Sequence, residues 1–315
     1  DMFMYHHTAK DSVEGMAKAI RAGVDNHCMG YVGAVIPAIK LGLLKEWELD
    51  TAVARLLRAR FKLGMFDEPS LNRYASIPYT VVNNYEHRMY AAELAKQSIV
   101  LLKNKNNILP LSKKIKSIAV IGPSADDPEV SLGNYNGEPA DVITVLEGIR
   151  SALGDDTQIK YHKGCNITDT LNYNREKDFK PAIQAAAGAD VVVFVGGISP
   201  RLEGEALQVK IDGFDGGDKT NLDLPSVQTA LLKELKKTGK PIILVLMNGS
   251  ALSINWENEN IDGIIEAWYG GEAAGQAVAN VLFGDYNPSG KLPVTFYKSI
   301  NDIPAFDDYA MKGKT

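Results

Sequence analysis

The apolar residues of the second half of the chain fall into short runs that alternate with amphipathic segments. Val191 to Val195 and Ile242 to Met247 are runs without polar interruption, which is typical of strands buried on both faces of a sheet. We expect strands at 117–122, 158–165, 190–196, 241–247, 263–268 and 291–296, and helices at 142–153, 178–187, 226–237 and 272–283. This alternation predicts an α/β fold with a mostly parallel sheet.

The first 67 residues have mainly helical patterns. Ser12 or Asp11 is placed to cap a helix that ends near Ala22, and Asp50 is placed to cap the helix TAVARLLRARFKLG. A further helix is expected at 35–41, and VDNHCMG (24–30) is short enough to be a strand. Residues 68–90 contain two prolines and little periodicity, so we interpret them as an interdomain linker. A helix that passes into a short strand is expected in YAAELAKQSIVLLKN.

A loop of roughly 25 residues follows the strand at 190–196, which is longer than a simple connection needs. It carries Glu203 and Glu205, with Arg201 just before them and Asp218 further on. Loops at the carboxyl ends of parallel strands commonly hold ligand chemistry. From spacing alone, two glutamates on a loop are more often surface charge than a catalytic pair. Arg201 could stabilise the charge of Glu203 or face water.

Composition and charge narrow the classes of function. The 315 residues are 45% hydrophobic and 23% charged, with a formal net charge of -5, so no basic surface for nucleic acid or anionic membrane is indicated. No apolar run is long enough to cross a bilayer. Cys28 and Cys165 are expected to be separate buried thiols, with one bridge as the alternative. The spacing of His6, His7, His27, Asp25 and Cys28 matches no metal-binding pattern, so no metal is expected.

Three segments carry a resemblance to a known family. GISPRLEGE, GGDKTNLDLPSVQ and AWYGGEAAGQAVANVLFGDYNPSGKLPVTFY resemble the C-terminal α/β sandwich domain of glycoside hydrolase family 3, which contains β-glucosidases and β-xylosidases. AIRAGVDNHCMG and AIKLGLLKEWELDTAVARLLRARFKLGMFD resemble the last strand and helices of the family's (β/α)8 barrel, which needs roughly 250 residues when complete. The resemblance implies a barrel remnant at 1–67, a linker at 68–90 and an α/β sandwich at 91–315.

The resemblance also implies site residues and a reaction. Glu203 matches the family's general acid/base, with Glu205 as second choice, and Asp218 lies in the counterpart of a G-D-R segment that braces the loop or only caps a turn. Tyr31 is a candidate sugar-binding residue, as are Arg201 and Asp218. The implied activity is a retaining exo-acting β-glycosidase that hydrolyses β-linked oligosaccharides or aryl and alkyl glycosides. It needs no cofactor.

The family's nucleophile is an Asp in an S-D-W or S-D-C motif, and this chain contains neither motif. Asp1 lacks the preceding Ser, and we interpret it as lying shortly after the nucleophile. We therefore expect the chain to be inactive alone, with the nucleophile supplied by a preceding portion of the barrel.

Other readings stay open at this point. One is a non-catalytic carbohydrate-binding or interaction fragment, and another is a nucleotide-binding domain, which only the sheet architecture favours. Glucosides and xylosides are equally possible substrates, and a homo-oligomer is possible. The family suggests a periplasmic or secreted location.

Overall fold

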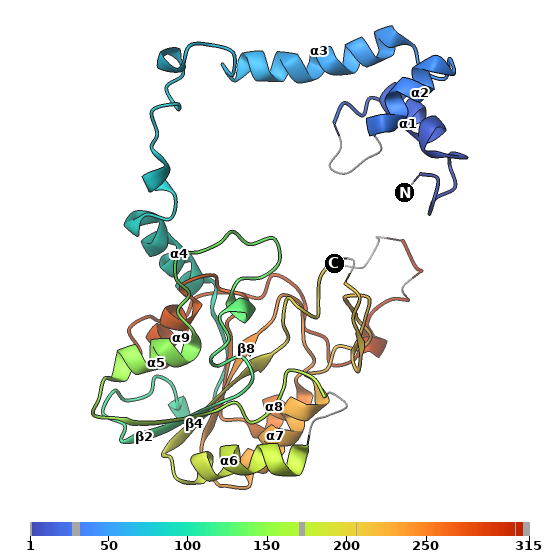
Figure 1. Ribbon diagram of the computed structural model, residues 1–315. Helices are drawn as coiled ribbons and strands as arrows, with labels where there is room; N and C mark the ends of the chain where they lie inside the picture. Colours follow the sequence, from blue (N-terminus) through green and yellow to red (C-terminus); the bar gives the residue numbers. More distant parts are fainter. Residues whose placement is uncertain (1, 27–31, 170–173, 206, 306, 311–315) are drawn as a thin grey trace. The chain divides into compact units, whose positions relative to one another are not determined.

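The computed structural model describes residues 2–26, 32–169, 174–205, 207–305 and 307–310. The chain divides into two compact units, unit one (residues 1–81) and unit two (residues 82–315), and each is described by itself (Figure 1). Helix α4 (Tyr85–Ser98) begins inside the segment predicted as linker, because the Asn84 side chain caps it by accepting a hydrogen bond from the His87 amide at 2.9 Å. The assignment of unit one to a barrel stays a prediction.

Unit one is helical. Helix α1 (Ser12–Arg21) is capped by Asp11, which accepts the Glu14 amide at 2.9 Å, and α2 spans Val35–Lys40. Helix α3 (Glu46–Lys62) begins earlier than predicted, so the proposed Asp50 cap is wrong. Its first turn is fixed instead by the Glu48 carboxylate, which accepts the Lys45 amide at 2.7 Å. Residues 24–26 have no strand structure, and the rest of the predicted VDNHCMG strand lies outside the described residues. Short 3-10 turns are η1 (Val32–Ala34), η2 (Pro69–Leu71) and η3 (Tyr79–Val81).

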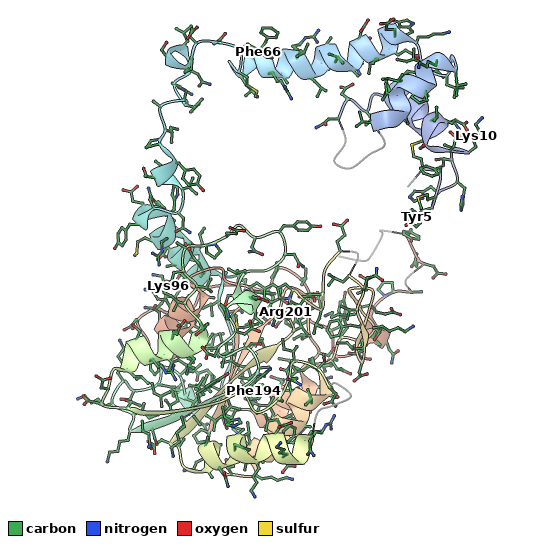
Figure 2. All side chains as sticks on the ribbon, in the orientation of Figure 1. Tyr5, Lys10, Phe66, Lys96, Phe194 and Arg201 are labelled. Carbon is green, nitrogen blue, oxygen red and sulfur yellow. The ribbon has the colours of Figure 1, made fainter. Side chains whose placement is uncertain are left out.

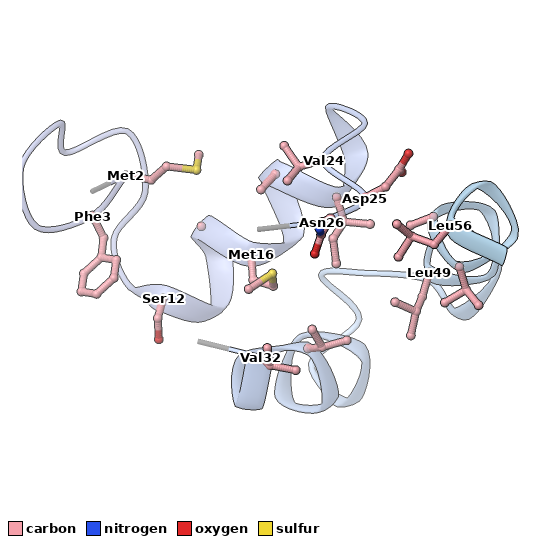
Figure 3. Close-up of a pocket in the computed structure, with 16 residues that line it drawn as sticks. Met2, Phe3, Ser12, Met16, Val24, Asp25, Asn26, Val32, Leu49 and Leu56 are labelled. Atoms are coloured by element: carbon pink, nitrogen blue, oxygen red, sulfur yellow. The ribbon is translucent and has the colours of Figure 1, made fainter. Parts of the chain in front are cut away.

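The core of unit one is small and one of its apolar faces is uncovered. Ala17, Ala38 and Leu44 are its buried centre. A cavity of about 500 Å³ opens among the helices, and apolar side chains such as Met16 and Leu49 line it (Figure 3). The apolar face of α3 is therefore only partly used within this unit.

Unit two is built on a six-stranded sheet in the order β1-β9-β8-β4-β2-β3. The strands are β1 (Val100–Asn104), β2 (Ser117–Ile121), β3 (Gln158–His162), β4 (Val191–Gly197), β8 (Ile242–Met247) and β9 (Gly263–Glu266). All neighbours pair in parallel except β1, which runs antiparallel to β9. The predicted α/β fold with a mostly parallel sheet is confirmed.

Two apolar layers enclose this sheet. Along β2, Ile118 and Val120 face one layer, whereas Ala119 and Ile121 face the other, as the alternation of side chains in a strand requires. Helices α4, α5 (Val145–Leu153) and α9 (Ala274–Leu282) cover the first face. Helices α6 (Arg175–Ala187), α7 (Ser226–Lys236) and α8 (Asn255–Asn260) cover the second (Figure 1).

The structure corrects several predicted elements. The described residues 291–296 form no strand: Pro293 lacks the amide that a ladder needs, and no sheet edge pairs with the segment. The long loop after β4 contains a small antiparallel sheet that was not predicted, β5 (Lys210–Ile211), β6 (Phe214–Asp215) and β7 (Asp218–Lys219). Helix α8 was also missed. Short turns complete the unit: η4 (Lys105–Asn107), η5 (Glu129–Ser131) and η6 (Ile300–Asp302). In the described part of the chain, no helix is long and apolar enough to span a membrane.

Candidate functional site

The carboxylate of Glu203 is held by three hydrogen bonds at one edge of the main sheet. Its Oε1 accepts the Gly249 amide at 2.8 Å and the Tyr269 hydroxyl at 2.6 Å, and its Oε2 accepts the Ser250 hydroxyl at 2.5 Å. The side chain of Glu203 is half-buried. The three donors fix the direction in which this carboxylate points.

The sheet topology explains why these residues meet. Strands β4, β8 and β9 are parallel neighbours, so their carboxyl ends lie at one edge. Glu203 follows β4, Gly249 and Ser250 follow β8, and Tyr269 follows β9. A side chain at Gly249 would crowd this meeting point, because a Cβ there would lie 3.0 Å from Glu203 Oε1 and 2.8 Å from a ring carbon of Tyr269.

The backbone around Glu203 is tied to two other segments. Asn134 Nδ2 donates to the Glu203 carbonyl at 2.7 Å, and the Gly204 amide donates to the Gly217 carbonyl at 3.2 Å. Gly217 has φ +95°, and a Cβ on it would lie 2.0 Å from the Gly204 carbonyl oxygen. Only glycine permits this close approach. The GGDK segment therefore braces the loop through its glycine backbone.

A second carboxylate lies beneath the first. Glu266, the last residue of β9, is fully buried, and burial raises its pKa to about 8; hydrogen bonds from Asn248 and the Trp268 amide lower it, and the nearby charge of Glu203 raises it. Burial, together with the adjacent charge of Glu203, also raises the pKa of the Tyr269 hydroxyl above its usual value, so this hydroxyl stays a donor.

One cation lies near the Glu203 carboxylate. Burial lowers the pKa of Lys219, while the negative charge of Glu203 raises it. Lys219 Nζ donates to the Ala251 carbonyl, which lies next to Ser250. Lys219 therefore links the loop after β4 to the turn after β8.

The remaining predicted site residues lie apart from this cluster. The Arg201 guanidinium pairs with Asp127 and Glu129 rather than with Glu203, and it lies on the loop after β4 (Figure 2). Glu205 is exposed and accepts the Tyr135 hydroxyl. Asp218 is exposed on β7. Tyr31 and Asp1 lie outside the described residues, so their proposed roles stay predictions.

The described residues contain no group of three or more His, Cys, Asp or Glu side chains that could hold a metal ion. His27 and Cys28 lie outside them. Cys165 is a buried free thiol, and burial raises its pKa to about 12, which makes it unreactive.

Sequence reasoning proposed Glu203 but did not propose the residues that surround its carboxylate. Asn248, Gly249, Ser250, Glu266 and Tyr269 each lie at or just after the end of a buried strand. Polar residues at the ends of neighbouring parallel strands were the available signal, but the order of the strands was needed to bring them together.

Comparison with known proteins places this geometry in a family. The model of the glycosyl hydrolase family 3 C-terminal domain matches residues 99–315. The chain belongs to glycosyl hydrolase family 3. This confirms the family resemblance and the α/β sandwich that it implied.

Relatives of this glycosyl hydrolase family 3 chain include proteins named β-xylosidase and β-glucosidase. It is 40% identical over 95% of its length to a β-xylosidase of Formosa agariphila, and 39% identical over 98% to a periplasmic β-glucosidase of Salmonella typhimurium. The crystal structure of a Listeria innocua β-glucosidase in complex with isofagomine superposes with a TM-score of 0.81 at 31% identity over 99% of the chain. The chain spans 41%, 42% and 41% of these three proteins, respectively.

Proposed function

We propose that the protein to which this chain belongs is a retaining exo-acting β-glycosidase that removes terminal non-reducing β-linked sugars, with Glu203 as its general acid/base. The observation that carries this proposal is a half-buried carboxylate, oriented by three donors at the carboxyl ends of β4, β8 and β9. Membership of family 3 and the names of the relatives support the substrate class.

The chemistry follows from what one positioned carboxyl group can do. Protonated Glu203 gives its proton to the glycosidic oxygen as the bond to the leaving group breaks, while a second carboxylate attacks the anomeric carbon. Ionised Glu203 then takes a proton from water, which attacks the same carbon and releases the sugar. In the proposal, the second carboxylate comes from a barrel segment outside this chain, of which unit one forms another part.

The test is hydrolysis of phenyl β-glucoside and phenyl β-xyloside by the full-length protein. We expect Glu203→Gln to lower kcat by about 10²- to 10⁴-fold, because phenolate is a poor leaving group that needs the proton. Glu205→Gln is the matched control and should retain activity within about tenfold. A large loss in the Glu205 variant alone would transfer the role to that residue.

The 315-residue chain is the second half of the test. We expect it to release no phenol, after its intact mass has been checked against the printed sequence. Turnover by this chain that disappears in Glu203→Gln would show that the nucleophile lies within it. If both the full-length protein and the 315-residue chain bind xylose or glucose without turnover, the alternative of a non-catalytic carbohydrate-binding protein is favoured. A periplasmic or secreted location stays a prediction.

A further inference from the structure

The two carboxyl oxygens of Glu266 bind two different segments. Oε2 accepts Asn248 Nδ2 at 3.1 Å, and Oε1 accepts the Trp268 amide at 3.1 Å. Asn248 is itself fully buried and its Nδ2 also donates to the Ser250 carbonyl at 2.9 Å. Glu266 is thus joined to the turn after β8 through Asn248, and to the segment after β9 through Trp268.

These two segments supply all three donors to Glu203. The turn after β8 gives the Gly249 amide and the Ser250 hydroxyl, and the segment after β9 gives the Tyr269 hydroxyl. We propose that Glu266 is a positioning residue for Glu203, because its carboxyl group ties together the two segments whose donors orient that side chain. The catalytic meaning of this inference rests on the proposed function, whereas the structural link does not.

The hydrogen bond from Trp268 to Glu266 holds an unusual backbone conformation. Trp268 has φ +57°, a region that bulky residues rarely adopt. Three interactions hold this conformation. The Trp268 amide donates to Glu266, and the indole Nε1 donates to the Ser98 carbonyl at 3.1 Å. The indole ring also packs edge-to-face on Phe296, with 6.0 Å between the ring centroids. Tyr269 is the next residue, so the direction of its side chain depends on this turn.

The burial of the Glu266 carboxyl group is energetically unfavourable in itself. Burying a polar group without full compensation is costly, and an apolar side chain would suit a fully buried strand position better. Asn248 Oδ1 has no hydrogen-bond partner among the described residues. The buried polar cluster of Asn248 and Glu266 is therefore not fully satisfied. An incompletely satisfied polar cluster that contacts the donors of Glu203 fits a positioning role better than a stabilising one.

Glu266→Gln is the variant that tests the link, with Glu257→Gln as its matched control. The amide of glutamine keeps one acceptor but faces the second donor with N–H groups, so one of the two hydrogen bonds is lost. Glu257, on α8, is another buried glutamate, 2% exposed, and its carboxyl group accepts the hydroxyl of Thr229 on α7 at 2.6 Å. Both variants replace one buried carboxyl group by an amide.

The first measurement does not depend on activity. In the 315-residue chain, we expect amide hydrogen exchange at Gly249 or Trp268 to become about tenfold faster in Glu266→Gln, and the Glu203 Cδ resonance to shift in glutamate-labelled carbon NMR. Glu257→Gln should leave all three signals as in the wild type. Unchanged signals in Glu266→Gln would overturn the inference. If that variant does not fold, Asn248→Ala should accelerate exchange at Gly249 and spare Trp268.

The second measurement uses the full-length protein and separates positioning from general damage. We expect Glu266→Gln to lower kcat/KM about tenfold for phenyl glycosides and less than about threefold for dinitrophenyl glycosides, since dinitrophenolate leaves without a proton. Equal losses with both substrates would contradict a positioning role. If the full-length protein hydrolyses neither substrate, the proposed function fails, and the exchange and NMR signals still decide whether Glu266 orients Glu203.

Discussion

Helix α3 of unit one leaves Val53, Leu56, Leu57 and Phe61 between 38% and 63% exposed, whereas strand β9 of unit two places the carboxyl group of Glu266 at 0%. The two units thus depart from ordinary burial in opposite directions. The exposed apolar side chains leave unit one without a complete core, and the burial of a carboxyl group lowers the stability of unit two. Such departures tend to mark places where a chain meets another surface or a substrate, and the proposed place of unit one in a barrel and the proposed acid/base role of Glu203 fit these two cases.

Separating the units should give the largest effect. We expect residues 82–315 to unfold cooperatively on their own, because two apolar layers enclose their sheet. Residues 1–81 should show no cooperative transition and should bind a hydrophobic dye, because their buried core is centred on three small or medium side chains. Circular dichroism during heating checks both. A sharp transition in the 1–81 fragment would remove the contrast.

Truncating one leucine in each unit sharpens the contrast. Leu244→Ala in β8 should lower the free energy of unfolding by about 2 to 5 kcal/mol, because Leu244 is fully buried between the sheet and its helices. Leu56→Ala in α3 should leave the main transition within about 0.5 kcal/mol. Urea unfolding of the 315-residue chain measures both. Equal losses would mean that the α3 face is packed in solution.

Sequence alone could predict the sheet where packing follows directly from composition. The five apolar residues Val191–Val195 and the six of Ile242–Met247 have no polar face, which favours a strand covered on both sides. The segment 291–296 mixes apolar residues with Lys291 and Thr295 and contains Pro293, and a strand there would have needed a free sheet edge that local sequence does not reveal.

The candidate site was less predictable because it is assembled over long sequence distances. Glu203 is 46 residues from Gly249, 47 from Ser250 and 66 from Tyr269. These residues meet only because β4, β8 and β9 are adjacent, and the order of strands is a property of the whole sheet. Glu266 was not proposed from the sequence, because its burial beside these residues depends on the same strand order.

The pH dependence of stability tests the burial of the Glu266 carboxyl group in unit two. The unfolded chain releases the Glu266 proton near its ordinary pKa of 4.5, whereas burial holds the folded-state pKa at about 8. Between these values the folded state binds more protons, so the contribution of Glu266 to stability is complete below pH 4.5 and falls until about pH 8. Each unit of pKa shift corresponds to about 1.4 kcal/mol, so a loss of a few kcal/mol is expected.

Urea unfolding from pH 4 to 9 measures this loss as the difference between wild type and Glu266→Gln. Subtraction cancels the contribution of Glu257, whose pKa burial also raises. The groups that face Glu266 are Glu203 and Tyr269 on the site side, and Asn248 and the Trp268 amide as donors. A difference that stays flat or rises with pH would show that Glu266 is ionised in the folded protein throughout.

The smallest effect is expected at Gly249, where the turn after β8 meets the Glu203 carboxylate and the Tyr269 ring. In Gly249→Ala, the new Cβ would lie 3.0 Å from Glu203 Oε1 and 2.8 Å from a ring carbon of Tyr269. These contacts are too short, so one of the two side chains must move. We expect a loss of about 1 to 2 kcal/mol in unfolding free energy, together with a shift of the Glu203 Cδ resonance. Gly137→Ala is the matched control, since no atom beyond its own residue and its two chain neighbours lies within 4 Å of its Cβ position. It should leave the stability unchanged or slightly raised, because alanine restricts the unfolded chain. If both variants behave alike, the turn after β8 is free to yield, and the three donors would not by themselves fix the direction of Glu203.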